Sequence, residues 1–470
     1  MTSLQLSPAE MRALGYRAVD IIVDHVETLR GRRVANQVPR TQLDAALGDF
    51  SEEPADPQRV LSLVEREVMS AVTAVDHPRF YAFVPGPGGF VGAMADALAS
   101  GFNVFAGHWL AASGPGAVEL QTIDLLRREC GLPDGAGGLF VSGGSMANLS
   151  GLAAARAVKL GGPDPSAVVY LCDQAHSSVA KGLRVLGFAP DQVRPVGVDD
   201  ELRMDVDLLA AAVAGDRRAG RRPFCVVASA GTTNTGAVDP LLEVSSVCMS
   251  EGLWLHVDGA YGAAAALTER GRAVLSGLEL ADSIALDPHK WLFQPFEIGC
   301  VLVRDVRHLR AAFAVHPEDN ATYLADVGRI AEREMTFYEH GVQLTRSFRA
   351  LKLWMSLRIF GLAAFRAAIE RGIALAEEVE SRLRADERWE VVTPAQLAVV
   401  TFAPRRPELS VQERNALVQR AVERLTADGY AMVTSTQVRD RVVLRFCLIH
   451  PDAQLSEVMD TADALARYCA

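Results

Sequence analysis

The sequence lacks the marks of several protein classes. Its seven cysteines are scattered without a C-x-x-C pair, which predicts neither a disulfide framework nor a thiolate metal site. No apolar run approaches the roughly 18 residues that a membrane span needs, and the N-terminus lacks the pattern of a signal peptide. The ten histidines include no H-E-x-x-H spacing, which argues against a metal hydrolase. These absences predict a cytoplasmic protein with no metal and no membrane partner.

Basic charge is also scarce. Lys and Arg number 47 against 58 Asp and Glu, which gives a formal net charge of −11. Nucleic acids and anionic membranes favour basic surfaces, so this balance argues against both as partners and favours a small-molecule substrate. A chain of 470 residues, 49% of them hydrophobic, is long enough for a large catalytic domain with smaller companions.

The hydrophobic pattern divides the chain into three predicted parts. Residues 1–82 contain an amphipathic helix over 7–30 and then a stretch without sustained period, which predicts a helical arm with a thin core. Residues 83–345 alternate short apolar runs with helical stretches, which predicts a large α/β domain with a mostly parallel sheet. Residues 346–470 predict a smaller C-terminal α/β lobe. The predicted strands are 138–141, 168–172, 224–229, 253–257, 283–286, 300–303, 389–392, 397–402, 431–434 and 442–446.

The sharpest chemical signal is Lys290, which follows the strand 283–286 and stands between His289 and Trp291. An amine between bulky groups at a strand end loses hydration, which favours the neutral form that a Schiff-base nucleophile needs. The ordinary alternative is a surface lysine whose stem packs on apolar neighbours while its ammonium group reaches water. Ligands of parallel sheets bind at strand ends, so Lys290 is a candidate catalytic residue.

Asp258 ends another predicted strand and is followed by the small residues Gly259 and Ala260. A carboxylate beside the pyridine nitrogen of pyridoxal 5′-phosphate (PLP) keeps that nitrogen protonated, which makes the ring an electron sink. The ordinary alternative is a strand-end Asp that caps the next turn. One strand and one helix separate Asp258 from Lys290 in the sequence, so we expect both residues at neighbouring points of one sheet edge.

Three weaker signals follow other predicted strands. Gly144 and Ser145 form a turn that opens an Ala-rich helix, and the free N–H groups of such a turn suit a phosphate ester. Gly-rich turns into helices are common, so this motif is weak alone. His176 offers a flat ring for stacking on a cofactor, and Thr233 offers a hydroxyl group. Their ordinary alternatives are a structural histidine and a turn residue.

Taken together, the sequence resembles the group II PLP-dependent amino acid decarboxylases, the family of aromatic-L-amino-acid decarboxylase. The resemblance covers essentially the whole chain. It is carried by His77-Pro-Arg-Phe-Tyr-Ala-Phe83, Asp173-Gln-Ala-His-Ser-Ser178, His256-Val-Asp258, Asp287-Pro-His-Lys290 and Val443-Leu-Arg-Phe446. It implies the α/β architecture of fold-type I (aspartate aminotransferase-like) PLP enzymes. It also implies a homodimer with its site at the subunit interface and the N-terminal arm wrapped over the partner.

The resemblance implies a role for each candidate residue. Lys290 would hold PLP as a Schiff base, Asp258 would pair with the pyridinium nitrogen, and His176 would stack on the ring. Ala260 would lie near the ring and His289 beside the Schiff base. The implied phosphate contacts are Gly144, Ser145 and Asp287, the last being Asn in many relatives. Tyr323 falls in a loop that relatives use for protonation at Cα, although a tyrosine there can also simply anchor the loop.

The implied reaction is decarboxylation of an L-amino acid to the amine and CO₂. Aromatic residues predict an apolar or aromatic substrate pocket, partly built by the partner subunit, although the same residues could belong to the core. The candidate substrate contacts are Phe83, Val84 and Phe105. Gly86 stands where relatives have a Thr that contacts the substrate carboxylate, so that contact must differ here. Oxidative decarboxylation to an aldehyde, transamination, and a silent PLP-binding homologue stay open as alternatives.

Overall fold

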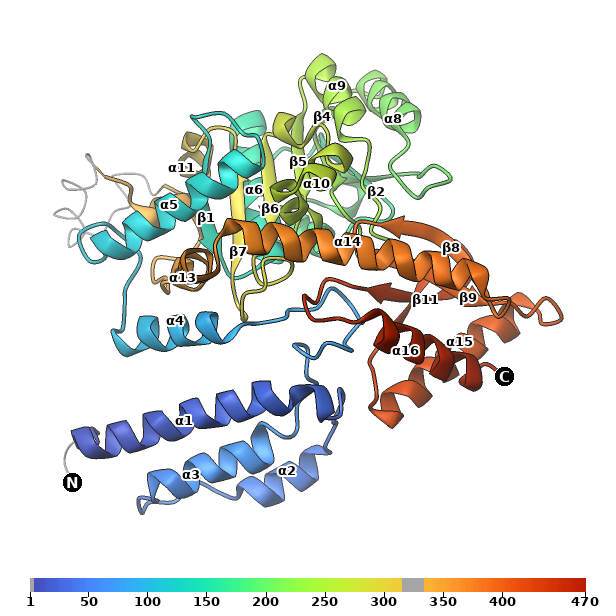
Figure 1. Cartoon of the computed structure of the whole chain (residues 1–470). Coiled ribbons are helices and arrows are strands. Elements are labelled where there is room, and N and C mark those ends of the chain that lie inside the picture. The colour runs from blue at the N-terminus through green and yellow to red at the C-terminus, as the bar shows by residue number, and fades with distance from the viewer. Residues whose placement is uncertain (1–3, 315–333) are drawn as a thin grey trace.

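The computed structural model describes residues 4–314 and 334–470. Figure 1 shows the N-terminal helices standing beside the body of the molecule, which consists of a large α/β domain and a smaller C-terminal lobe. Within the described ranges, no helix is long and apolar enough to cross a membrane. All seven cysteines are buried and unpaired.

The N-terminal arm consists of helices α1 (Pro8–Thr28), α2 (Arg40–Leu47) and α3 (Pro57–Leu63). A capping box starts α1, because the Ser7 hydroxyl receives the Glu10 N–H and the Glu10 carboxylate receives the Ser7 N–H. The predicted helix over 7–30 is therefore confirmed. None of the residues of α1 is buried in the single chain.

The large domain is built on a seven-stranded sheet with the order β1-β7-β6-β5-β4-β2-β3. Its strands are β1 (Gly137–Val141), β2 (Ala167–Cys172), β3 (Val193–Val196), β4 (Arg222–Ser229), β5 (Trp254–Asp258), β6 (Ser283–Leu286) and β7 (Gly299–Val303). The section from β6 to β3 is parallel, whereas β7 is antiparallel to both of its neighbours. The predicted mostly parallel sheet is thus confirmed. The edge strand β3 was missed because its Val-Arg-Pro-Val sequence contains the proline and charge typical of edges.

Helices cover both faces of this sheet (Figure 1). They are α4 (Phe90–Gly101), α5 (Ser113–Glu129), α6 (Gly144–Leu160), α7 (Ser177–Val185), α8 (Val206–Arg218), α9 (Leu241–Glu251), α10 (Glu269–Val274) and α11 (Arg307–Phe313). Neighbouring residues of β4 face opposite sides, since Val226 packs into one hydrophobic cluster and Val227 into another. Helix α6 packs across β4, β5, β6 and β7, which brings its first turn to the strand ends.

The C-terminal part comprises α13 (Ala350–Phe360), α14 (Leu362–Ala385), α15 (Val411–Asp428) and α16 (Leu455–Tyr468) with a four-stranded antiparallel sheet. The strands, in the order β10-β11-β9-β8, are β8 (Trp389–Gln396), β9 (Val399–Pro404), β10 (Thr434–Val438) and β11 (Arg441–Cys447). Helix α13 packs against α4 and α5 of the large domain. The boundary that we predict between residues 345 and 346 lies just before this helix, and it stays a prediction.

One predicted strand of the lobe, 431–434, is misplaced, because β10 begins only at Thr434. The apolar residues just before Thr434 contact a different part of the chain. Met432 forms an isolated bridge with Phe80, and its carbonyl accepts the Tyr81 N–H at 2.8 Å. Their apolar character reflects packing against the segment that leads out of the arm.

A buried ion pair fixes the end of β1 next to the site. Arg346 Nη2 lies 2.6 Å from Glu119 Oε1, and both side chains are 1% exposed. The same carboxylate oxygen accepts the Phe140 N–H at 3.1 Å, and Arg346 donates to the Phe140 carbonyl at 2.9 Å. A buried pair of this kind needs such added hydrogen bonds to offset the cost of desolvation. It holds the strand that leads into the turn before α6.

Candidate active site

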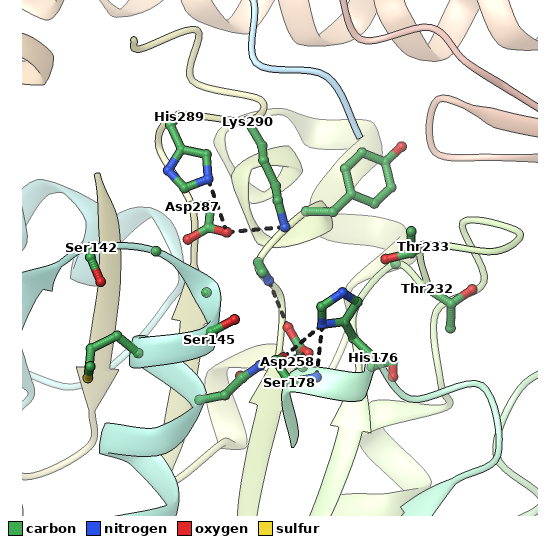
Figure 2. A pocket seen from close by; sticks show the side chains of 18 residues that line it. Ser142, Ser145, His176, Ser178, Thr232, Thr233, Asp258, Asp287, His289 and Lys290 are labelled. Atoms are coloured by element: carbon green, nitrogen blue, oxygen red, sulfur yellow. Dashed lines mark hydrogen bonds and ion pairs between the residues drawn. The ribbon is translucent and has the colours of Figure 1, made fainter. Parts of the chain in front are cut away.

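A pocket of about 390 Å³ opens at the carboxyl ends of β4, β5 and β6, beside the first turns of α6 and α7. Figure 2 shows the side chains that enter it, with Lys290 and Asp258 coming from opposite ends and His176 from one side. The predicted residues that line it are Gly144, Ser145, His176, Thr233, Asp258, Ala260, Asp287, His289 and Lys290. The structure therefore brings together every residue predicted for the cofactor side of the site.

Lys290 lies in the loop after β6 and pairs with a carboxylate. Its Nζ is 3.1 Å from Asp287 Oδ2, and its side chain is 23% exposed. A carboxylate thus lies beside this amine in addition to the bulky neighbours noted in the sequence. Trp291, on the other flank, is fully buried as expected.

His289 lies against the same carboxylate. The Ile298 N–H donates to His289 Nδ1 at 3.2 Å, which leaves Nε2 to carry the hydrogen of the neutral ring. That nitrogen is 3.5 Å from Asp287 Oδ2. Burial lowers the pKa of His289 below its ordinary value, so the neutral ring is favoured at neutral pH.

Asp258 is the last residue of β5, and its Cα is in register with Ala285 of β6. The adjacent strand-end positions predicted for Asp258 and Lys290 are thus confirmed. The Ala260 N–H donates to Asp258 Oδ1 at 3.2 Å, and the Asn148 amide donates to Oδ2 at 2.9 Å. Each carboxylate oxygen thus accepts a hydrogen bond, and Asp258 lines the pocket.

The first turn of α6 forms an anion site. As the first helical residues, Gly144 and Ser145 have N–H groups without a partner inside the helix. A Cβ on Gly144 would lie 2.8 Å from Asp287 Oδ2 and 2.9 Å from Ala260 Cβ, so only glycine fits this position. Asp287 Oδ1 is buried and has no hydrogen-bond partner among the described residues. An amine, a buried carboxylate and a helix N-terminus around one pocket fit the aldehyde, ring nitrogen and phosphate of PLP.

His176 forms the N-cap of α7, where its Nδ1 accepts the Ser178 N–H at 3.2 Å. Its ring reaches the rim of the pocket (Figure 2). Thr233 and Thr232 lie beyond it in the loop after β4. His176 therefore has both a local structural role and a place at the site.

Three predicted substrate contacts do not line this pocket. Phe83 is 56% exposed, and the Phe105 ring packs on His108 with ring centres 5.3 Å apart. Val84 also lies outside the pocket lining of the described chain. Tyr323 falls outside the described residues.

The sequence reasoning missed Asn148, Ser178 and Tyr261, which also line the pocket. Asn148 has a signal in the sequence, since it stands one helical turn after Gly144 in a stretch whose other residues up to Ala155 are small or apolar. Ser178 follows His176 by two residues. Tyr261 stacks on Trp291 with ring centres 5.1 Å apart, and its hydroxyl accepts the Ala398 N–H from the C-terminal lobe.

Stability at acid pH should depend on His256, a fully buried residue of β5. Burial lowers its pKa from 6.5 to about 4. The folded pKa is depressed, so its contribution to stability is complete above pH 6.5 and is lost as the pH falls toward 4. Between pH 7 and pH 5 we expect the free energy of unfolding to fall by about 2 kcal/mol more than in His256→Gln. Urea unfolding at both pH values measures this difference, and parallel pH profiles of the two proteins would contradict it.

Comparisons with known proteins match almost the whole chain. Residues 39–405 match the family model of the pyridoxal-dependent decarboxylase conserved domain. The chain is 48% identical over 459 residues to an aromatic-L-amino-acid decarboxylase of Bacillus atrophaeus, covering 97% of this chain and 95% of that one. It is 29% identical to a phenylacetaldehyde synthase of Arabidopsis thaliana, with 94% and 92% covered. A crystal structure of Oryza sativa TDC with PLP and tryptamine superposes with a TM-score of 0.94 at 29% identity, covering 100% and 99%.

Proposed function

The chain belongs to the pyridoxal-dependent decarboxylase family, and we propose that it decarboxylates an aromatic or apolar L-amino acid with Lys290 holding PLP. It is a PLP-dependent carboxy-lyase of fold-type I that converts an L-amino acid to the amine and CO₂. One observation carries the proposed site. The amine of Lys290 and the carboxylate of Asp258 enter a single pocket from the ends of adjacent strands.

PLP, when bound, supplies a conjugated ring that accepts the electron pair left as the bond from Cα to the carboxylate breaks. We assign Lys290 to hold its aldehyde carbon and Asp258 to pair with its ring nitrogen. The N–H groups of Gly144 and Ser145 would bind the phosphate at the N-terminus of α6. His176 and Ala260 would lie against the ring, with Thr233 at its edge.

Asp287 has a further task in this arrangement. Its carboxylate pairs with Lys290 Nζ and lies beside His289, so it orients the amine and keeps it at the mouth of the pocket. A carboxylate is a poor ligand for a phosphate because the two charges repel. The phosphate contact implied for Asp287 by the family resemblance therefore stays a prediction. His289 would hold Asp287 through its Nε2–H.

An aromatic substrate is favoured by the relatives. The Bacillus atrophaeus protein, 48% identical, is named an aromatic-L-amino-acid decarboxylase, and the Oryza sativa TDC structure contains tryptamine. We propose that Phe83, Val84 and Phe105 contact the substrate side chain from a second copy of the chain, because they lie outside the pocket of their own chain. Tyr323 is proposed to assist protonation at Cα, as in the family.

We also propose that the protein is a cytoplasmic homodimer. Met11 and Tyr16 on α1 are exposed, as is Phe102 at 81%, which is costly for an isolated chain. A largely apolar groove of about 1040 Å³ runs between α1, α3 and the segment around Pro295 and Phe296. Its size and character suit burial against a second copy.

The test is a product balance. PLP-loaded protein is given L-tryptophan, L-tyrosine, L-phenylalanine, L-leucine or L-glutamate, and CO₂, amine, aldehyde and peroxide are measured together. Equal CO₂ and amine from an aromatic or aliphatic substrate is the expected result. Aldehyde with peroxide would replace this proposal by the oxidative reaction, and a keto acid would indicate transamination. No turnover of any substrate would contradict the proposed substrate class.

A further inference from the structure

A continuous chain of side-chain hydrogen bonds lies buried beneath the pocket. The Trp254 indole Nε1 is 2.8 Å from Ser283 Oγ, which is 2.8 Å from His256 Nδ1. His256 Nε2 is 2.9 Å from Asn148 Oδ1. Each of these four residues is at most 1% exposed, so water does not compete for their polar groups.

Chemistry fixes the direction of this chain from the end at Asp258. A carboxylate only accepts hydrogen bonds, so the amide nitrogen of Asn148 must face it. That nitrogen donates to Asp258 Oδ2 at 2.9 Å and to Ser178 Oγ at 3.0 Å, which uses both of its hydrogens. The amide oxygen therefore faces His256, and His256 Nε2 must carry a hydrogen.

The other end of the chain of hydrogen bonds is compatible with this direction. An indole N–H only donates, so Ser283 Oγ accepts from Trp254, and with the hydrogen of His256 on Nε2 the hydroxyl hydrogen of Ser283 can be donated to His256 Nδ1. His256 is thus a neutral ring in one tautomer, consistent with a pKa lowered to about 4 by burial. A Cβ on Gly151 would lie 2.7 Å from this ring, so α6 has a glycine where the imidazole needs room.

A branch of the chain reaches the pocket. Ser178 Oγ accepts the second amide hydrogen of Asn148, so its own hydrogen points to His176 Nδ1 at 2.8 Å. The backbone N–H of Ser178 also donates to that nitrogen, at 3.2 Å. Nδ1 of His176 is therefore an acceptor, and the hydrogen of its neutral ring is on Nε2.

We propose that Asn148 and His256 are positioning residues that hold the Asp258 carboxylate toward the cofactor and fix the tautomer of His176. The inference rests on the proposed pairing of Asp258 with the ring nitrogen of PLP. The other tautomer of His256 would require Asn148 to turn, which would set the amide oxygen against the carboxylate. His256 thus acts on Asp258 only through Asn148.

The first test measures the dissociation constant of PLP from the full-length protein. Asn148→Leu and His256→Phe each remove a link, and each should weaken PLP binding about tenfold or more, since hydrogen bonds to charged groups are strong. The double variant should be no weaker than Asn148→Leu alone, because the two residues act in series. His256→Gln keeps a donor toward Asn148 and should restore most of the affinity.

The matched control is Ser150→Ala. Ser150 is fully buried in the same helix, but its hydroxyl donates to the Met146 carbonyl and takes no part in the chain. We expect no significant change in the PLP dissociation constant for this variant. Additive losses in the double variant, or a loss in Ser150→Ala equal to that in Asn148→Leu, would show that general packing and not positioning is at work.

A second measurement determines the histidine tautomers in the protein without any substitution. Nitrogen-15 NMR of the full-length PLP-bound protein labelled at histidine should show His256 and His176 with hydrogen on Nε2, and a His256 signal from an Nδ1–H ring would overturn the proposal.

The variant Asp258→Asn separates the proposed pairing of Asp258 with PLP from the proposed positioning role of Asn148 and His256. If Asp258→Asn binds PLP with unchanged affinity, the proposed pairing itself is wrong. If it binds weakly while Asn148→Leu and His256→Phe match Ser150→Ala, only the positioning role is wrong.

Discussion

Replacing Lys290 by alanine is expected to lower kcat for decarboxylation by at least about a thousandfold, because the amine that holds the cofactor and exchanges it to substrate is lost. The variant should still fold, since Lys290 forms an ion pair with Asp287 alone among the described residues and its side chain is 23% exposed. Release of CO₂ from the best substrate measures the loss. The absorption band of the covalently held cofactor should disappear in parallel.

Lys181→Ala is the matched control, because Lys181 is exposed on α7 close to the same pocket. It should keep both activity and absorption band. Retention of more than a tenth of the wild-type kcat by Lys290→Ala would exclude Lys290 as the residue that holds PLP.

Replacing Asp258 by asparagine is expected to lower kcat about a hundredfold or more and to weaken PLP binding. The substitution keeps the shape of the side chain but removes the charge that would keep the ring nitrogen protonated. It also places an amide where Asn148 and the Ala260 N–H now donate to a carboxylate. Steady-state kinetics at saturating PLP separates the loss of chemistry from the loss of cofactor.

Asp282→Asn is the control for this second variant. Asp282 is a half-buried carboxyl group that accepts the Leu255 N–H at 2.8 Å, just before β6 and away from the strand ends that form the site. Burial raises its pKa, so its environment resembles that of an interior carboxyl group. If Asp282→Asn and Asp258→Asn lose activity equally, the effect is structural and the proposed pairing is not supported.

The sequence was sufficient to predict the residues at the strand ends. Asp258 and Lys290 each follow a short apolar run, and parallel strands bring such positions to one edge of the sheet. The Gly144-Ser145 turn was equally readable, because a glycine turn into a helix exposes its N–H groups whatever the remaining fold. In these cases the local sequence pattern alone indicates where the residues lie in the fold.

Other features depend on contacts that no local pattern encodes. Asn148 meets Asp258 only because α6 packs across β5, and its distance from Asp258 in the chain hides the pair. The phosphate contact of Asp287 stays a prediction, whereas its ion pair with Lys290 arises in the loop after β6 and was not predicted from the sequence. The apolar residues before β10 were predicted to form a strand. They instead contact the segment around Phe80, which a local pattern cannot show because it lies far away in the sequence.

The exposed surface of α1 should make the stability of the arm depend on protein concentration. A helix of 21 residues gains most of its stability from packing an apolar face, and α1 buries no residue against its own chain. In the proposed homodimer the full burial of its apolar face requires association, so the free energy that orders the arm grows with protein concentration. Dilution would therefore loosen the arm before it affects the sheet, and the monomer would be the form most open to proteases at its N-terminus.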